Sequence, residues 1–367
     1  MTKIIGSPTR YIQGKGELKR LAKHASTLGN KLFVIVDANI KDIVKSDIET
    51  SLDGTNTTIL FEDFRGECCM TEINRIIEIV EGNNCNVVVG VGGGKTHDTS
   101  KAVAYYVKKP VVIVPTIAST DAPCSSLSVI YSDEGVFEKY LFLPSSPNMV
   151  LVDTEIVSHA PARLLVAGIG DAMATYFEAR ACYRSDADNC LNGKCTKASL
   201  ALAKLCYETL LEDGKSAVLA VNSKVCTKAV ENIIEANTYL SGIGFESGGL
   251  AGAHAVHNGL TAIEATHKLY HGEKVAFGTL VQLVLENAPI KEIEEVIHLC
   301  QSVGLPTTLE DLNITKVNLE DIMEVAKLIC SPNDTIGNMP FEVTVDDVYA
   351  AILGADEIGK SYKNTNE

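Results

Sequence analysis

Positive charge is in short supply in this 367-residue chain, which has 32 Lys and Arg residues against 47 Asp and Glu residues and a net charge of −15. Nucleic-acid phosphates and anionic membrane surfaces are bound by clustered cations, so this composition argues against both kinds of partner. The chain also has no run of about 18 apolar residues, the length that spans a bilayer. Its first residues lack the apolar core of a secretory signal, so we expect a cytoplasmic protein.

The sequence also contains no CxxC motif. Its 11 cysteines are odd in number. In a chain without an export signal they are expected to be reduced thiols, most of them buried. The apolar fraction of 46% is enough for large cores, and the length predicts two domains at about 150 residues each. The last residues, KNTNE, are expected to form a frayed tail.

The first part of the chain alternates short apolar runs with helical patterns. Fully apolar strands between helices are typical of a parallel sheet that is covered on both faces. We expect strands at Leu32–Asp37, Thr57–Phe61, Asn86–Val91, Pro110–Pro115 and Met149–Asp153, with helices at Glu72–Val80 and Lys95–Val107.

After about residue 160, long Ala- and Leu-rich segments replace the apolar strands, with Gly, Pro, Asn and Asp between them. We therefore predict a Rossmann-like parallel α/β domain over residues 1–160 and an all-α domain over residues 161–367, with the boundary near His159–Pro161. The expected helices are Leu164–Cys182, Lys197–Leu211, Ser223–Leu240, Leu250–Glu264, Lys274–Glu286, Ile290–Val303, Asn318–Leu328 and Val345–Lys360.

The most informative segment, GVGGGKTHDTSK, runs from Gly90 to Lys101, between an expected strand and an expected helix. Glycines let the backbone approach a phosphate closely, and the start of a helix offers free N–H groups and the positive end of its dipole. Lys95 adds a positive charge, and Thr96 is a candidate cap for the helix. Three successive glycines followed by Lys favour a phosphate-binding loop over a simple tight turn. The segment matches neither GxGxxG nor the P-loop pattern.

Two further segments are expected beside this loop, because the carboxyl ends of parallel strands meet at one edge of a sheet. Asp37 ends the first apolar strand. Its carboxylate is either a simple turn residue or a ligand of an adenosine ribose, and in the second case it would repel the extra phosphate of NADP. A hydroxyl-rich segment, Pro115–Tyr131, follows the fourth strand. Its donors include Thr116, Ser119 and Ser125, with Asp121 as an acceptor among them.

The helical half contains a candidate metal site. One acid with two imidazoles is a standard ligand set for catalytic zinc and leaves a fourth position open. Any single histidine is more often a hydrogen-bonded core residue, and the spacings alone do not choose between an i,i+3 pair and an i,i+4 pair. The candidates are Asp171 in GIGDAMAT, and His254, His257, His267 and His271.

Five segments occur together in the order and spacing of a known family: GVGGGKTHDTSKA, VPTIASTDAPCSSLSVIY, GIGDAMATYFEAR, ESGGLAGAHAVHNGLT and HGEKVAFGTL. They resemble the bacterial glycerol dehydrogenases, zinc-dependent members of the iron-containing alcohol dehydrogenase superfamily. The resemblance covers essentially the whole chain. It implies a dehydroquinate synthase-like fold, with an NAD-binding α/β domain followed by a helical domain that binds metal and substrate.

The resemblance also implies how NAD would be held. Asp37 would bind the adenosine ribose, and Gly93, Gly94 and Lys95 would hold the pyrophosphate. His97, which stands where the family usually has Leu, would face solvent or donate weakly to phosphate. The nicotinamide half would be surrounded by Thr116, Ser119, Ser125, Leu127 and Tyr131.

Metal and substrate ligands follow from the same resemblance. One zinc ion per chain would be held by Asp171, His254 and His271, which leaves His257 and His267 in outer or structural roles. Thr175 stands where iron-type members have a histidine ligand, and its presence favours zinc with one open position. Asp121 and Phe245 would contact the substrate, and Asp121 would join the three metal ligands as the catalytic set.

The activity implied is NAD-dependent oxidation of glycerol, or of a related vicinal diol, to dihydroxyacetone or the matching hydroxyketone, by hydride transfer from a zinc-bound alkoxide. A homo-oligomer is implied by the resemblance alone. The alternatives are a glycerol-1-phosphate dehydrogenase and a dehydroquinate synthase-like zinc lyase, but few cations for a substrate phosphate lie near the metal segments. A non-catalytic NAD-binding protein is a third alternative, and it would have no use for the Asp and His set.

Overall fold

The computed structural model describes residues 1–332 and 334–364. These residues divide into two compact units. The first, called the sheet unit, comprises Gly6–Ala160 and Lys224–Cys226. The second, called the helical unit, comprises Met1–Ile5, Pro161–Ser223 and the described residues from Thr227 onwards. The division thus assigns the first five residues to the helical unit and three residues after position 223 to the sheet unit.

The strands of the sheet unit confirm the predicted parallel α/β fold. Within the described residues, six strands form one parallel sheet. Their order across the sheet is β1 (Tyr11–Gly14), β8 (Met149–Asp153), β5 (Val111–Pro115), β4 (Val87–Gly92), β2 (Lys31–Asp37) and β3 (Thr58–Phe64). The sequence did not predict β1, because this strand is short, lies at the edge and is only half-buried.

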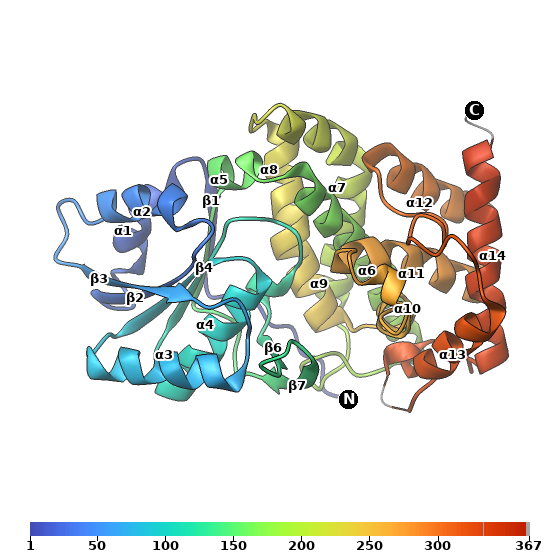
Figure 1. Cartoon of the computed structure of the whole chain (residues 1–367), viewed down its shortest axis with the longest axis horizontal. Helices are drawn as coiled ribbons and strands as arrows, with labels where there is room; N and C mark the ends of the chain where they lie inside the picture. Colours follow the sequence, from blue (N-terminus) through green and yellow to red (C-terminus); the bar gives the residue numbers. More distant parts are fainter. Residues whose placement is uncertain (333, 365–367) are drawn as a thin grey trace. The chain divides into compact units, whose positions relative to one another are not determined.

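Helices cover both faces of this sheet, as the apolar strands require. Figure 1 shows α1 (Leu21–Ala25) and α2 (Lys41–Thr50) on one face, with α3 (Met70–Gly82) and α4 (Gly94–Val107) on the other. Between them, valines of adjacent strands such as Val34, Val89 and Val112 are fully buried in one hydrophobic core. This two-sided burial explains why the strands lack alternation of polar and apolar residues.

The chain reverses its direction of travel across the sheet between β2 and β4. Val36 of β2 is paired with Val91 of β4, and the neighbouring strands β3 and β5 lie on opposite sides of this pair. Ligands of open α/β sheets bind at the carboxyl edge at such a switch point. The ends of β2 and β4, which carry Asp37 and the glycine loop, are therefore the expected place for a ligand.

A small antiparallel hairpin and several short helices complete the sheet unit. The hairpin consists of β6 (Leu127–Tyr131) and β7 (Phe137–Phe142). The sequence did not predict β7, because most of its side chains are exposed on both faces and no alternation results. The remaining elements are η1 (Glu17–Arg20), η2 (Ala122–Cys124) and α5 (Thr154–His159).

The helical unit confirms the predicted all-α second half. Helix α6 (Ala162–Ser185) packs against α7 (Lys197–Asn222), α9 (Ser241–Gly248) and α11 (His271–Leu285). The other α-helices are α8 (Lys228–Glu235), α10 (Gly252–Leu260), α12 (Ile290–Val303), α13 (Leu319–Ile329) and α14 (Val345–Asn364). Shorter helical turns lie at η3 (Ala236–Leu240), η4 (Glu264–Thr266) and η5 (Thr335–Asn338).

The C-terminal residues and the cysteines can be compared with what the sequence predicted. Helix α14 continues through Lys363 and Asn364, so a frayed tail is wrong for these two residues, and positions 365–367 lie outside the described residues. The described cysteines are all free and most of them are buried, as expected. In the part of the chain that the structure describes, no helix has both the length and the apolar character to cross a membrane.

Candidate functional site

The glycine loop after β4 leads directly into helix α4. Gly93 has an extended backbone and precedes the first residue of the helix, and the first helical hydrogen bond is donated by the His97 N–H to the Gly93 carbonyl, at 3.0 Å. The N–H groups of Gly94, Lys95 and Thr96 come before that bond, so they have no acceptor within the helix. Such groups form an anion site at the positive end of the helix dipole. Thr96 is buried within the first turn and does not cap the helix, so that prediction was wrong.

Lys95 already has a carboxylate partner. Its Nζ lies 2.6 Å from Oε2 of Glu67 and 5.4 Å from the centre of the Tyr131 ring. No pattern in the sequence pointed to Glu67 as this partner. A phosphate bound at the loop would compete with this carboxylate for the lysine.

Asp37 lies at the carboxyl end of β2, beside the strand that carries the glycine loop. Its Oδ1 accepts hydrogen bonds from the backbone N–H and the side-chain amide of Asn39, at 2.9 and 3.0 Å. This is the local turn that a terminal aspartate commonly forms. The ribose-binding role of Asp37 remains a prediction.

The hydroxyl-rich loop after β5 is held by a buried lysine of α4. Lys101 of α4 is fully buried, and its ammonium lies 2.9 Å from Oδ1 of Asp98. The same ammonium donates to the carbonyl of Ala122 at 3.0 Å, to the carbonyl of Leu127, and to Ser125. Asp98 in turn accepts from the Val129 N–H at 3.1 Å. One buried ion pair thus fixes the loop and the start of β6.

The other predicted cofactor residues lie in or beside this loop. Thr116 is buried and donates its N–H to the Gly92 carbonyl at 3.1 Å, which ties the loop to the glycine segment. Burial, with smaller contributions from Asp98 and Glu67, raises the pKa of Tyr131 to about 12. Ser119 and Asp121 are half-buried in the loop before β6. These placements leave their contacts with a cofactor or substrate as predictions.

His97 does not face solvent, so that alternative was wrong, and weak donation to a phosphate remains a prediction. Its side chain is buried beneath the glycine loop in the first turn of α4. Burial and the nearby charge of Lys101 lower its pKa to about 3, so the ring is neutral. The residue therefore belongs to the packing under the loop.

In the helical unit, three predicted ligands lie together. Nε2 of His271 is 3.1 Å and Nε2 of His254 is 3.5 Å from Oδ1 of Asp171, and the two Nε2 atoms are 3.4 Å apart. Among the described residues, Asp171, His254 and His271 are a group whose donor atoms are close enough to share one metal ion. They come from α6, α10 and α11.

Glycines next to two of these ligands allow their helices to meet. A Cβ atom on Gly272 would collide with the Ala167 carbonyl and would lie 2.8 Å from the Asp171 nitrogen. A Cβ atom on Gly170 would collide with the Gly272 carbonyl. The backbones of α6 and α11 therefore touch beside Asp171 and His271, and a side chain at either glycine would push the two ligands apart.

The spacing of the three donor atoms fits a metal ion. A tetrahedral ion with ligands at about 2.0–2.1 Å separates neighbouring ligand atoms by about 3.3–3.4 Å. The observed separations of 3.1, 3.4 and 3.5 Å bracket this value. One carboxylate and two imidazole nitrogens are also donors that suit zinc and related divalent metals.

Each imidazole is oriented by a second partner. Nδ1 of His254 lies 2.6 Å from Oε2 of Glu178, and Nδ1 of His271 lies 2.9 Å from Nε2 of His257. From His257 the contacts continue through Asn258, whose oxygen is 3.0 Å from Nδ1 of His257, to Asp334, whose Oδ2 accepts from the Asn258 amide at 3.2 Å. These contacts direct both Nε2 lone pairs at the place where the three ligands converge.

The electrostatics of this cluster favour a positive charge within it. Burial would lower the pKa of His254, but Glu178 and Asp171 raise it well above its usual range. Burial would raise the pKa of Asp171, but the two histidine ligands hold it well below its usual range. Burial and then the charge of His271 lower the pKa of His257, which is therefore neutral. The carboxylates that attract a proton to His254 attract a metal ion for the same reason.

Three other predicted residues of the helical unit have packing or surface positions. Thr175 donates or accepts a 2.8 Å hydrogen bond with Ser241 of α9, and its methyl group occupies the space that a side chain on Gly244 would need. Phe245 is buried in the same helix, so its role in substrate binding remains a prediction. His267 is exposed, and its ring is 2.9 Å from the Thr261 carbonyl.

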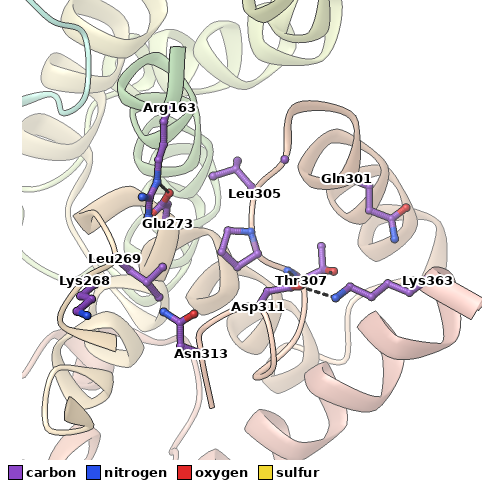
Figure 2. Close-up of a pocket in the computed structure, with 12 residues that line it drawn as sticks. Arg163, Lys268, Leu269, Glu273, Gln301, Leu305, Thr307, Asp311, Asn313 and Lys363 are labelled. Atoms are coloured by element: carbon purple, nitrogen blue, oxygen red, sulfur yellow. Dashed lines mark hydrogen bonds and ion pairs between the residues drawn. The ribbon is translucent and has the colours of Figure 1, made fainter. Parts of the chain in front are cut away.

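A polar pocket of about 790 Å³ lies elsewhere in the helical unit (Figure 2). Four of its charged side chains form two pairs: Arg163 forms two hydrogen bonds with Glu273, and Lys363 lies 2.5 Å from Asp311, while Lys268 also lines the pocket. Glu273 also accepts from the Tyr270 N–H at 2.7 Å, immediately before His271. The pocket therefore borders the segment that carries a ligand but contains none of the three ligands itself.

Comparisons with known proteins identify the family of the chain. The family model of iron-containing alcohol dehydrogenases matches residues 8–154. A glycerol dehydrogenase of Escherichia coli O6:H1 is 55% identical over 99% of both chains, and a glycolaldehyde reductase of Halobacterium salinarum is 46% identical over 99% of this chain and all of that one. A crystal structure of glycerol dehydrogenase from Schizosaccharomyces pombe, 38% identical, superposes with a TM-score of 0.95 over 99% of this chain and 93% of the other. The chain belongs to the iron-containing alcohol dehydrogenase family.

Proposed function

We propose that this chain oxidises glycerol, or a related vicinal diol, to the corresponding hydroxyketone with NAD and one zinc ion. The observation that carries the proposal is the convergence of Asp171, His254 and His271 at separations that suit a tetrahedral ion. Full-length similarity to glycerol dehydrogenases supports the substrate class. The free, mostly buried cysteines support a reducing compartment such as the cytoplasm.

The metal would be held by Oδ1 of Asp171 and by the Nε2 atoms of His254 and His271. Thr175 forms a hydrogen bond with Ser241 and would not be a fourth ligand. Bound there, zinc supplies a Lewis acid that lowers the pKa of a coordinated hydroxyl group. Glu178 and His257 lie against the Nδ1 atoms of the two imidazoles, so the Nε2 atoms remain on the side of the proposed metal. Three protein ligands are the usual number in catalytic zinc sites, and Asp171, His254 and His271 would supply them.

NAD supplies the acceptor for the hydride, and the residues of the sheet unit bind and orient it. The free N–H groups at the start of α4 and Lys95 would hold the pyrophosphate with Gly93 and Gly94. Asp37 would bind the adenosine ribose. The nicotinamide would lie against the loop that Lys101 fixes, where Asp121 would bind substrate hydroxyls. The residues proposed around the nicotinamide are Thr116, Ser119, Ser125, Leu127 and Tyr131.

The reverse reaction on a short hydroxyaldehyde is a second candidate, because a relative 46% identical over the whole chain is a glycolaldehyde reductase. Both reactions exchange a hydride between the nicotinamide and a carbon next to a hydroxyl-bearing carbon. They differ in direction and in the length of the substrate.

We also propose a homo-oligomer, for which family resemblance is the support and a solution mass measurement is the test.

The proposal is tested by following NADH absorbance with a panel of substrates. Purified protein is supplied with NAD and glycerol, propanediol, butanediol, ethanol or glycerol-1-phosphate, and separately with NADH and glycolaldehyde. We expect vicinal diols to be oxidised far faster than ethanol and the phosphate ester not to be used. Preference for glycerol-1-phosphate, or no net NADH from any diol, would contradict the proposal. Faster use of glycolaldehyde than of any diol would favour the second candidate.

A further inference from the structure

Glu178 lies on the same helix as the metal ligand Asp171, seven residues further along α6. Residues seven apart are two turns apart and share one face of a helix. Both carboxylates therefore face His254, which has Asp171 3.5 Å from its Nε2 and Glu178 2.6 Å from its Nδ1. The Glu178 side chain is fully buried.

Both carboxylate oxygens of Glu178 are used. Oε2 faces Nδ1 of His254, and Oε1 accepts the backbone N–H groups of Ala251 and His254 at 2.8 and 2.9 Å. These two N–H groups belong to the start of α10, where a helix has donors without intrahelical acceptors. Glu178 thus fixes the backbone of His254 and its ring at the same time.

We propose that Glu178 is the positioning residue for the metal site: it holds the proton of His254 on Nδ1, so that Nε2 can bind the metal, and it contributes a second buried negative charge. The inference rests on the proposed metal-dependent function. A neutral imidazole carries one N–H, and a carboxylate accepts but does not donate, so the contact with Glu178 fixes which nitrogen is protonated. Asp171 and Glu178 together balance the two charges of a divalent ion.

The second histidine ligand is oriented by a weaker arrangement. The partner of His271 is an imidazole, that of His257, and the nearest carboxylate in that chain of contacts, Asp334, lies beyond Asn258. Hydrogen bonds to an ionised group are stronger than those between neutral groups. The loss of Glu178 should therefore affect metal affinity more than the loss of Asp334.

Glu178→Gln removes the negative charge of Glu178 and one of its two acceptor atoms but leaves the packing of the side chain nearly unchanged. Glutamine has nearly the same shape, but only one end of its amide accepts hydrogen bonds. If the oxygen keeps the two backbone N–H groups, the amide N–H₂ faces Nδ1 of His254 and favours the tautomer whose Nε2 is protonated. If the amide is reversed, N–H₂ opposes two backbone N–H donors. In either orientation His254 is a poorer ligand.

The experiment measures zinc affinity of the metal-free full-length protein by competition with a chelator. Partners that orient a histidine ligand typically contribute 10–100-fold to metal affinity, so we expect Glu178→Gln to bind zinc about 10–100-fold more weakly than wild type. Glu178→Asp, which retains the charge, should recover part of this loss. The affinity for NAD, measured by fluorescence, should stay within about twofold, because the predicted cofactor residues lie in the sheet unit.

The matched control is Asp356→Asn. Asp356 is also a buried acid that accepts a backbone N–H, that of Leu309 at 2.8 Å, and it is paired with Lys360. Its replacement should lower the unfolding midpoint without changing zinc affinity. Zinc affinity of folded Glu178→Gln within about twofold of wild type would overturn the proposal. If that variant does not fold, Glu178→Asp decides, because zinc affinity equal to wild type with a carboxylate one methylene shorter would overturn it as well.

Zinc binding and NAD reduction by the wild type test the proposed function, whereas zinc binding by Glu178→Gln tests the role of Glu178. If wild-type protein binds no zinc and reduces no NAD with diols, the proposed function is wrong. If wild type binds zinc and Glu178→Gln binds it equally well, the proposed function stands and only the role of Glu178 is wrong.

Discussion

The glycine loop of the sheet unit and the metal cluster of the helical unit acquire their geometry in different ways. In the loop, neighbours along the chain suffice: Gly93 precedes the helix, the next N–H groups point from its start, and Lys101 of the same helix fixes the following loop. In the cluster, the ligands come from three helices, and each imidazole is oriented by a further side chain. A local motif is visible in a sequence, whereas a convergence of distant helices depends on packing.

The largest effect on the loop should come from Lys101→Met. The replacement leaves Asp98 buried without its cation and removes one donor each from the carbonyls of Ala122 and Leu127. Breaking a buried ion pair from one side costs about 3–5 kcal/mol, so we expect that loss in the free energy of unfolding by denaturant, together with weaker NAD binding. Lys109→Met, an exposed change on the same segment, should alter neither. Unchanged stability and NAD affinity in Lys101→Met would contradict the claim that the Lys101–Asp98 pair fixes the loop.

A smaller, pH-dependent effect is expected at His97. Its pKa is about 3 in the folded chain against an ordinary 6.5, mainly because the ring is buried. Between these values the unfolded chain binds a proton that the folded chain does not, so stability falls as the pH is lowered below about 6.5. At about pH 5 this amounts to roughly 2 kcal/mol.

The test is His97→Leu, which replaces the titrating ring with an apolar side chain of similar size. The difference in unfolding free energy between variant and wild type should shift in favour of the variant by roughly 2 kcal/mol between neutral pH and about pH 5. A difference that does not change with pH would show that the ring is protonated or exposed in the folded chain.

The smallest effect concerns cofactor choice. Asp37→Ser removes the carboxylate at the end of β2 but keeps a side chain that can accept from Asn39. We expect the preference for NAD over NADP to fall about tenfold, equivalent to about 1.4 kcal/mol, as measured from the two cofactors' kcat/KM. Asp42→Ser, an exposed acid in α2, is the control for a general change in charge. Equal use of NADP by the wild-type protein would make the ribose assignment wrong.

The sequence predicted the sheet and most helices because their signals are local. The runs LFVIVD and NVVVGV are apolar except for one terminal residue each, and they form most of β2 and β4, which both have a neighbouring strand on either side. Helix α9 was not predicted, because SGIGFESG contains three glycines, two of which are required by close packing against Thr175 and Ala179 of α6. Such a helix is stabilised by its neighbours rather than by its own residues.

The candidate site was predictable in part. Spacing left four histidines as candidate ligands, and resemblance to a family selected His254 and His271. Glu178 was missed, although an acid seven residues after Asp171, on the same buried face of α6, was a signal. Lys101 was missed because it donates to backbone carbonyl groups. Every residue has such a group, so the sequence does not show which of them a lysine will contact.

The central claim is that Asp171, His254 and His271 hold one catalytic zinc, and metal analysis coupled to NAD reduction with glycerol tests it most directly. We predict about one zinc per chain, loss of activity when a chelator removes the metal, and recovery when zinc is returned. His271→Ala should abolish turnover and leave NAD binding largely intact. Full activity after verified removal of the metal, or a fully active His271→Ala protein, would contradict the account.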